Sequence, residues 1–214
     1  MKQRIIISLI SGLLLAMVCG GCAHDKDAIR PAEEMFQLAT DLAERGKVEK
    51  ATDAFMEVRT YHPGHELARE ALLSLGDLHY DNALYDEALR YYGEYRLLFP
   101  TDTGAPYSLF RIGMCHFQRR SSFDRDQSQT VKAIETFELF LAAYPESPYA
   151  PEARERLFDA RKLLAEHHLS IGRFYLRNKN TDAACRRFQQ VREQFSGLGL
   201  DSEIEQLILK ACPR

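Results

Sequence analysis

YDEALRYY, residues Tyr85–Tyr92, is the clearest copy of a pattern that occurs four times in this chain. In it, Ala88 is followed four positions later by Tyr92 and eight positions after that by Pro100. A small residue lets two helices cross closely, an aromatic ring fills the space beside the crossing, and proline ends a helix. Each copy therefore predicts a pair of packed helices, and the other copies are Ala51-Phe55-Pro63, Ala133-Phe137-Pro145 and Ala184-Phe188-Ser196.

This spacing resembles the tetratricopeptide repeat, a helical hairpin of about 34 residues. In three copies a small residue lies twelve positions before the alanine, as in that repeat: Ala39, Gly76 and Gly172. A single hairpin cannot bury its apolar face alone, so neighbouring hairpins stack. We therefore expect an all-α fold, a tetratricopeptide-repeat superhelix (α-solenoid) of about four and a half helical hairpins, which binds other proteins.

The third copy is longer than the others between its two helices. Gly113 and Ala133 are 20 positions apart instead of 12, and the extra residues fall within the polar segment 118–130. We expect a surface loop in this segment. Two interpretations are open: the loop is merely a tolerated insertion, or it contacts a partner.

The fourth copy is lengthened in its first helix. Pro145 and Gly172 are 27 positions apart, whereas the matching spacing in the second and third copies is 13. Apolar residues at helical spacing predict one helix of about 27 residues over 151–177, roughly 40 Å long. A break near His167-His168 is the alternative. A last amphipathic helix, Asp201–Ala211, is expected to cap the stack.

The first residues form a targeting segment. Basic residues precede an apolar run, Ile5–Val18, which is shorter than the about 20 residues that a membrane-spanning helix needs. The run ends in VCGGCA, which resembles a bacterial lipobox. That resemblance implies that residues 1–21 are a cleaved lipoprotein signal peptide and that Cys22 carries the acyl chains, palmitate among them. Release of a soluble protein after ordinary signal cleavage is the alternative.

The mature chain is divided accordingly. Residues 22–30 are expected to be a lipidated flexible tether, residues 31–146 the first three repeats, and residues 147–214 the fourth repeat with its long first helix and the capping helix. Ala23, rather than aspartate, follows the lipidated cysteine. By resemblance to the sorting rules of such lipoproteins, this residue implies export to the outer membrane.

Composition argues against several functions. The chain has 28 basic and 31 acidic residues, a formal net charge of −3 and no long basic block, so we expect no nucleic-acid partner. The sequence has no metal-binding spacing, no glycine-rich phosphate loop and no nucleophile motif. We therefore expect no enzyme activity, no metal and no cofactor apart from the covalent lipid on Cys22.

The chain has five cysteines, and removal of residues 1–21 with Cys19 would leave three besides Cys22: Cys115, Cys185 and Cys212. An odd number of thiols does not suit a disulfide framework. Cys115 and Cys185 lie in predicted helices, where a cysteine behaves as a small hydrophobic residue. The sequence therefore favours free thiols, with a Cys185–Cys212 bridge as the alternative.

Taken together, a lipobox, four and a half repeats, an insertion in the third and a lengthened fourth resemble the BamD family, the outer-membrane assembly lipoproteins of the β-barrel assembly machinery. The resemblance covers about 28–209 and is most specific over Asp124–Asn178. It implies a lipid-anchored scaffold of the outer membrane that faces the periplasm. Its carboxy-terminal repeats would dock on the POTRA portion of a BamA-like barrel protein, its amino-terminal repeats would receive unfolded outer-membrane proteins, and other Bam lipoproteins would join the complex.

A second function fits the same repeats. Another periplasm-facing tetratricopeptide lipoprotein could act as an adaptor of the envelope or of peptidoglycan synthesis. A coiled-coil heptad segment before the repeats would favour that function, and none lies between Cys22 and Pro31. The long fourth-repeat helix and the insertion in the third repeat favour barrel assembly.

The register of the repeats places certain first-helix residues in the groove that would bind a substrate peptide. For the third repeat they form an aromatic patch, which we expect to receive the terminal strand of an unfolded barrel protein. The alternative is that Phe110 and Phe117 simply pack between repeats three and four. The groove residues are Phe36, Asp77, Tyr80, Tyr107, Phe110 and Met114.

Arg186 and Arg187 follow the packing residue Ala184 on the second helix of repeat four. By resemblance to a basic position of the family, Arg187 would meet an acidic residue of the POTRA partner. A solvated helix face is the alternative.

Overall fold

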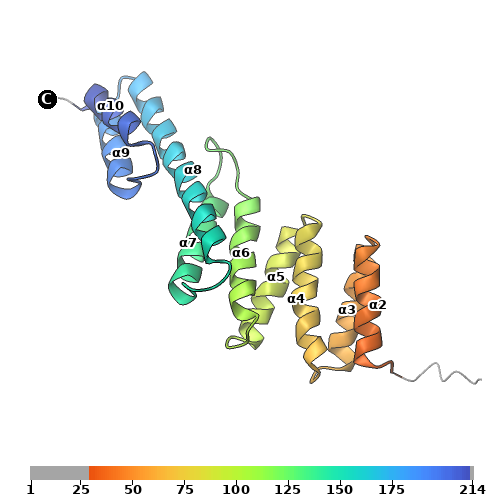
Figure 1. Cartoon of the computed structure of the whole chain (residues 1–214). Coiled ribbons are helices and arrows are strands. Elements are labelled where there is room, and N and C mark those ends of the chain that lie inside the picture. The colour runs from red at the N-terminus through yellow and green to blue at the C-terminus, as the bar shows by residue number, and fades with distance from the viewer. Residues whose placement is uncertain (1–28, 213–214) are drawn as a thin grey trace, which may run out of the picture. The chain divides into compact units, whose positions relative to one another are not determined.

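The computed structural model describes residues 29–212, and every regular element in that range is a helix (Figure 1). Residues 1–28, with the expected signal peptide and Cys22, lie outside the described residues. The helices are α2 (Ala32–Glu44), α3 (Val48–Tyr61), α4 (Glu66–Asp81), α5 (Tyr85–Leu98), α6 (Ala105–Gln118), α7 (Ser128–Ala143), α8 (Ala150–Arg177), α9 (Thr181–Gln194) and α10 (Asp201–Ala211).

The helices pack as successive hairpins, which confirms the predicted fold class. The pairs α2–α3, α4–α5, α6–α7 and α8–α9 are the four hairpins, each also packs on the next one, and α10 packs on α9. The first turn contains Gly46 with φ at +67°, a left-handed conformation that glycine adopts without steric cost. Residues 32–214 form one compact unit, which is described here by itself.

The predicted contact between a small residue and an aromatic ring occurs at the helix crossings of the second, third and fourth hairpins. A Cβ atom added to Gly76, Gly113 or Gly172 would lie 2.4, 2.6 or 2.3 Å from the nearest ring atom of the aromatic residue on the second helix. These distances are far below van der Waals contact, so only glycine fits at these crossings. The rings are Tyr92, Phe137 and Phe188, and all three are fully buried.

Replacing Gly76 by alanine is expected to lower the free energy of unfolding by about 1–3 kcal/mol, because the new methyl group overpacks against the ring of Tyr92. Gly93 is the matched control, since it lies inside α5 and a Cβ there meets no atom within 4 Å. Gly93→Ala should raise stability by about 0.5–1 kcal/mol through better helix propensity. Urea unfolding followed by circular dichroism measures both, and equal effects of the two substitutions would contradict the crossing argument.

The long helix of the fourth repeat is continuous. Helix α8 has 28 residues and no break at His167-His168, as the main prediction stated. Its first half contributes Ala153 and Ala160 to the core of the third hairpin. Its second half contributes Ala165 and Leu169 to the core shared with α9 and α10. One helix therefore connects two hydrophobic cores.

The capping helix α10 is covalently attached to the last hairpin, which corrects the preference for free thiols. Cys185 on α9 and Cys212 at the end of α10 form a disulfide, with Cα atoms 4.9 Å apart. The turn after α9 returns the chain so that Ile204 and Ile208 pack near Phe188, and this packing brings the two cysteines together. Cys115 is free and buried, as expected of a small hydrophobic residue.

The insertion in the third repeat is the segment 119–127 between α6 and α7. It folds back onto the second half of α8, where the Nδ1 atom of His167 lies 2.5 Å from the carbonyl oxygen of Phe123. Gln127 closes the segment by donating to the carbonyl oxygens of Ser122 and Arg125. The loop is thus part of the surface around α8, and whether a partner contacts it stays a prediction.

Candidate functional site

A groove of 490 Å³ lies along the first helices of repeats one and two. Its apolar base includes Phe36 of α2, which is half-buried and meets Phe55 of α3 edge-on with 5.4 Å between ring centroids. Its polar side is built by α4, whose Asp77 and Asp81 line the groove together with Glu70. The structure therefore places the predicted Phe36 and Asp77 in one groove.

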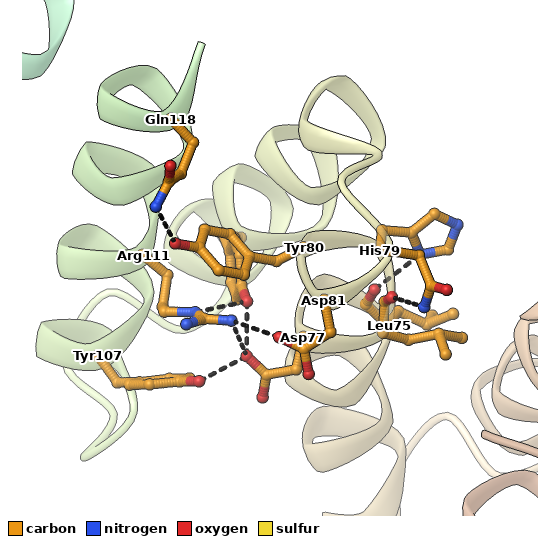
Figure 2. Close-up of polar contacts among 11 residues, drawn as sticks. Leu75, Asp77, His79, Tyr80, Asp81, Tyr107, Arg111 and Gln118 are labelled. Atoms are coloured by element: carbon orange, nitrogen blue, oxygen red, sulfur yellow. Dashed lines mark hydrogen bonds and ion pairs between the residues drawn. The ribbon is translucent and has the colours of Figure 1, made fainter. Parts of the chain in front are cut away.

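Asp77 is at the centre of a cluster that joins repeats two and three. Its Oδ1 atom accepts hydrogen bonds from the hydroxyl groups of Tyr92 on α5 and Tyr107 on α6. The guanidinium of Arg111, also on α6, lies 3.4 Å from the same oxygen and 3.5 Å from Oδ1 of Asp81. Figure 2 shows Tyr107 and Arg111 converging on Asp77 from α6, the first helix of the third repeat.

Arg111 also contacts Tyr92 and Tyr80. Its Nε atom donates to the hydroxyl of Tyr92 at 3.0 Å, and its guanidinium carbon lies 3.7 Å from the ring centroid of Tyr80. A cation held over an aromatic face in a partly desolvated site is favourable by about 0.5–2 kcal/mol. We call Asp77, Tyr80, Tyr92, Tyr107 and Arg111 the Asp77 cluster.

The electrostatics of the Asp77 cluster keep its groups in one protonation state. Burial, with the neighbouring charge of Asp77, raises the pKa of both Tyr92 and Tyr107, so their hydroxyl groups remain protonated donors. Burial alone would lower the pKa of Arg111, but Tyr92, Tyr107 and Asp77 outweigh it and raise that pKa, so the guanidinium stays charged. A cluster with fixed charges of this kind orients side chains rather than transferring protons.

Phe110 and Met114 are not groove residues, which corrects the sequence-based expectation. Their exposed fractions are 4% and 7%. Tyr149, in the turn before α8, stacks on Phe110 with 5.1 Å between centroids and 14° between planes, and Phe140 of α7 lies 5.8 Å away. The alternative interpretation is therefore right: Phe110 and Phe117 belong to the core between the third hairpin and α8.

The two arginines predicted to contact a partner, Arg186 and Arg187 on α9, differ in their surroundings. Arg186 is exposed, and Arg187 is half-buried. Nη1 of Arg187 lies 3.2 Å from Oε1 of Gln190 and 3.4 Å from Nδ1 of His168. Burial first, and then the charge of Arg187, lowers the pKa of His168, so the imidazole is neutral and can accept this hydrogen bond.

Two features are absent from residues 29–212, the part of the chain that the structure describes. No helix there is both long and apolar enough to cross a bilayer. No three histidine, cysteine or acidic side chains in that range are grouped closely enough to hold a metal ion.

Sequence reasoning missed two residues of this region. The role of Arg111 is not predictable, because a single arginine between apolar positions of a predicted helix gives no indication of its partner. Tyr149 ends the segment YPESPY, residues 144–149, and no periodicity in the sequence indicates that it covers Phe110.

Comparisons with known proteins identify a family that this chain matches. The family model described as YfiO, outer membrane lipoprotein, matches residues 29–209. The "Outer membrane protein assembly factor BamD" of Caulobacter vibrioides is 32% identical over 191 residues, which are 86% of this chain and 63% of that protein. The protein of the same name from Rickettsia prowazekii is 28% identical over 194 residues, 89% of this chain and 77% of that protein. This chain thus spans less than two thirds of the length of the Caulobacter protein.

Among solved structures, a tetratricopeptide repeat protein from Parabacteroides merdae superposes with a TM-score of 0.47. It is 13% identical, and the superposition covers 88% of each chain.

Proposed function

The chain belongs to the YfiO family of outer membrane lipoproteins, and on that basis we propose that it is a scaffold that assists the folding and insertion of outer-membrane β-barrel proteins. The printed names of its relatives, outer membrane protein assembly factors, support this role, and the family match confirms the resemblance inferred from the repeats. In this proposal the protein is no enzyme. It is anchored through a lipid on Cys22 and faces the periplasm.

The observation that carries the proposal is the groove between α2 and α4. Phe36 offers an apolar surface, while Asp81, Glu70 and the Oδ2 atom of Asp77 offer acceptors for backbone amides. A groove with these two features suits an extended peptide that presents alternating side chains and free N–H groups. We assign it to segments of unfolded outer-membrane proteins. Tyr80 and Tyr107, held by the Asp77 cluster, continue the same face toward the third repeat.

The carboxy-terminal hairpin is proposed to meet the POTRA portion of a BamA-like barrel protein. Arg186 is exposed, and Arg187 has no carboxylate within ion-pair distance among the residues that the structure describes. A cation that keeps its charge and lacks an internal acidic partner is suited to an acidic residue of another protein. Other Bam lipoproteins would join the same complex.

A photocrosslinking amino acid at Phe36 tests the substrate groove. We expect the full-length protein labelled there to capture an unfolded outer-membrane protein, because the side chain lies at the base of the groove. The control position is Leu97 on α5, which is 80% exposed but lies outside the groove. Equal capture from both positions, or capture from neither in a folded protein, would refute the assignment.

Charge reversal at Arg187 tests the partner contact. We expect Arg187→Glu to weaken co-purification with the POTRA-containing barrel protein by about three- to tenfold, since an exposed ion pair contributes up to about 1 kcal/mol and reversal adds repulsion. Lys50→Glu on α3 makes the same charge change at an exposed position in the first repeat. Unchanged co-purification of Arg187→Glu would count against the contact, whatever the control shows.

A further inference from the structure

A second pocket, of 470 Å³, lies between the start of α6 and the turn that connects α7 to α8. We call it the tyrosine–proline pocket, because three tyrosines and three prolines line it: Tyr107, Tyr144, Tyr149, Pro106, Pro145 and Pro148. The segment YPESPY contributes four of the six. The residues that line the groove between α2 and α4 do not line this pocket, but Tyr107, which adjoins that groove through its hydrogen bond to Asp77, does.

The rings of this pocket are held in place by neighbours. Tyr149 stacks on the buried Phe110, and its centroid lies 5.4 Å from that of Tyr107. Tyr107 is fixed by its hydrogen bond to Asp77. Tyr144 packs on Phe140 with 5.9 Å between centroids. A ligand that enters would therefore not have to order these side chains, which removes a main cost of binding.

The turn that carries two of the rings is itself rigid. The amide of Ser147 donates to the carbonyl oxygen of Tyr144 at 3.1 Å, and the amide of Ala150 donates to the carbonyl oxygen of Ser147 at 2.9 Å. The amide of Tyr149 lies 3.3 Å from the hydroxyl oxygen of Ser147. Pro145 and Pro148 further restrict the backbone. The distance between Tyr144 and Tyr149 is thus set by the turn.

The chemistry of the lining points to one class of ligand. Flat aromatic faces separated by prolines are the surface on which polyproline II segments dock, since their rings pack on tyrosine at little conformational cost. Glu146 is the one charged residue among those that line the pocket, and it is exposed. A carboxylate at the edge of an otherwise uncharged pocket favours a basic residue in the ligand.

We propose that the tyrosine–proline pocket binds an extended, proline-rich segment of a partner protein that carries a basic residue beside its prolines. The prolines pack on Tyr107, Tyr144 and Tyr149, and the basic residue pairs with Glu146. The pocket is a second peptide-binding site, next to the third repeat, with a preference that the substrate groove does not have.

Fluorescence anisotropy tests the proposal with the full-length protein in detergent micelles. The probe is a labelled synthetic peptide of one arginine followed by three Pro-Pro-Ala units. We expect saturable binding by the wild-type protein, and no saturable binding of a peptide in which alanine replaces every proline. A third peptide, with glutamate in place of arginine, should bind about fivefold more weakly because Glu146 then repels it.

Three variants test whether the peptide binds in the pocket rather than elsewhere on the surface. Ala143 lines the pocket and is exposed at the end of α7, so Ala143→Arg should obstruct it and weaken binding about tenfold without removing a core contact. Ala142→Arg is the matched control, because Ala142 is exposed on the same helix but does not line the pocket. Glu146→Lys should reverse the preference between the arginine and glutamate peptides.

Several outcomes would overturn the proposal. The first is a lack of saturable binding by the wild-type protein. The second is equal binding of the alanine peptide, which would indicate an unselective apolar surface. The third is an equal loss of binding in Ala143→Arg and Ala142→Arg. Self-association of the chain at the pocket, detected as displacement of the probe at high protein concentration, would also overturn it. Crosslinking from Phe36 should be unchanged in Ala143→Arg, so failure here is distinct from failure of the substrate groove.

Discussion

Phe137→Ala is expected to lower the free energy of unfolding by about 3–5 kcal/mol, the range for removing a buried phenylalanine side chain. Phe137 is fully buried, and its ring lies at 6.3 and 6.4 Å between centroids from Phe110 and Phe117. The ring also fills the space beside Gly113, where no side chain can replace it. The substitution therefore empties the centre of the core shared by α6, α7 and α8.

Urea unfolding followed by circular dichroism measures this loss. Stacked repeats gain stability from each hairpin and from the interface with the next one, so we expect the third and fourth hairpins to unfold at a lower urea concentration than the rest. Leu139→Ala on the same helix is the control, since Leu139 is 54% exposed and its removal should change stability by no more than about 0.5 kcal/mol. A loss below about 1 kcal/mol for Phe137→Ala would contradict the packing argument.

Replacing both Cys185 and Cys212 by serine is expected to cost about 3.5 kcal/mol. The disulfide closes a loop over a sequence separation of 27 residues, and a cross-link of that span removes this much chain entropy from the unfolded state. Helix α10 packs against α9 and covers the end of the stack. Without the bond, α10 should detach first, because a terminal unit has a neighbour on one side only.

Amide hydrogen exchange over Asp201–Ala211 measures the release of α10 directly. We expect faster exchange in the double variant and in the wild-type protein treated with a thiol reductant. The reductant should have no further effect on the double variant, which separates loss of the bond from loss of the thiols. Protection of α10 that survives both treatments would show that Ile204 and Ile208 hold the helix without the disulfide.

Most of the architecture could be predicted from local patterns. Helix α10 begins and ends at the predicted residues, and α8 is a single helix because no proline interrupts its apolar stripe after the first turn. The pairing of Gly76 with Tyr92, and of Gly172 with Phe188, was also predictable, because both partners lie within one hairpin. Such contacts depend on helical periodicity and a short turn, which are encoded close together in the chain.

The surface of the third repeat could not be predicted in the same way. Phe110 and Met114 have the spacing of groove residues, yet the turn before α8 places Tyr149 against Phe110 and buries the patch. The same packing creates the tyrosine–proline pocket, which no single segment contains. The Asp77 cluster likewise needs α4, α5 and α6 at their final crossing angles before Arg111 reaches Asp77.

The pairing and length of the helices thus follow from the sequence alone. A helix repeats every 3.6 residues, and the two helices of a hairpin are neighbours in the chain and pack on each other. The exposure of side chains, the Cys185–Cys212 bond, the groove between α2 and α4 and the tyrosine–proline pocket depend on contacts between helices of different hairpins or of the cap. Such contacts join residues that are far apart in the sequence: Asp77 and Tyr107, for example, are separated by 30 positions. Their geometry is set by how whole helices stack, and no local repeat of the sequence records it.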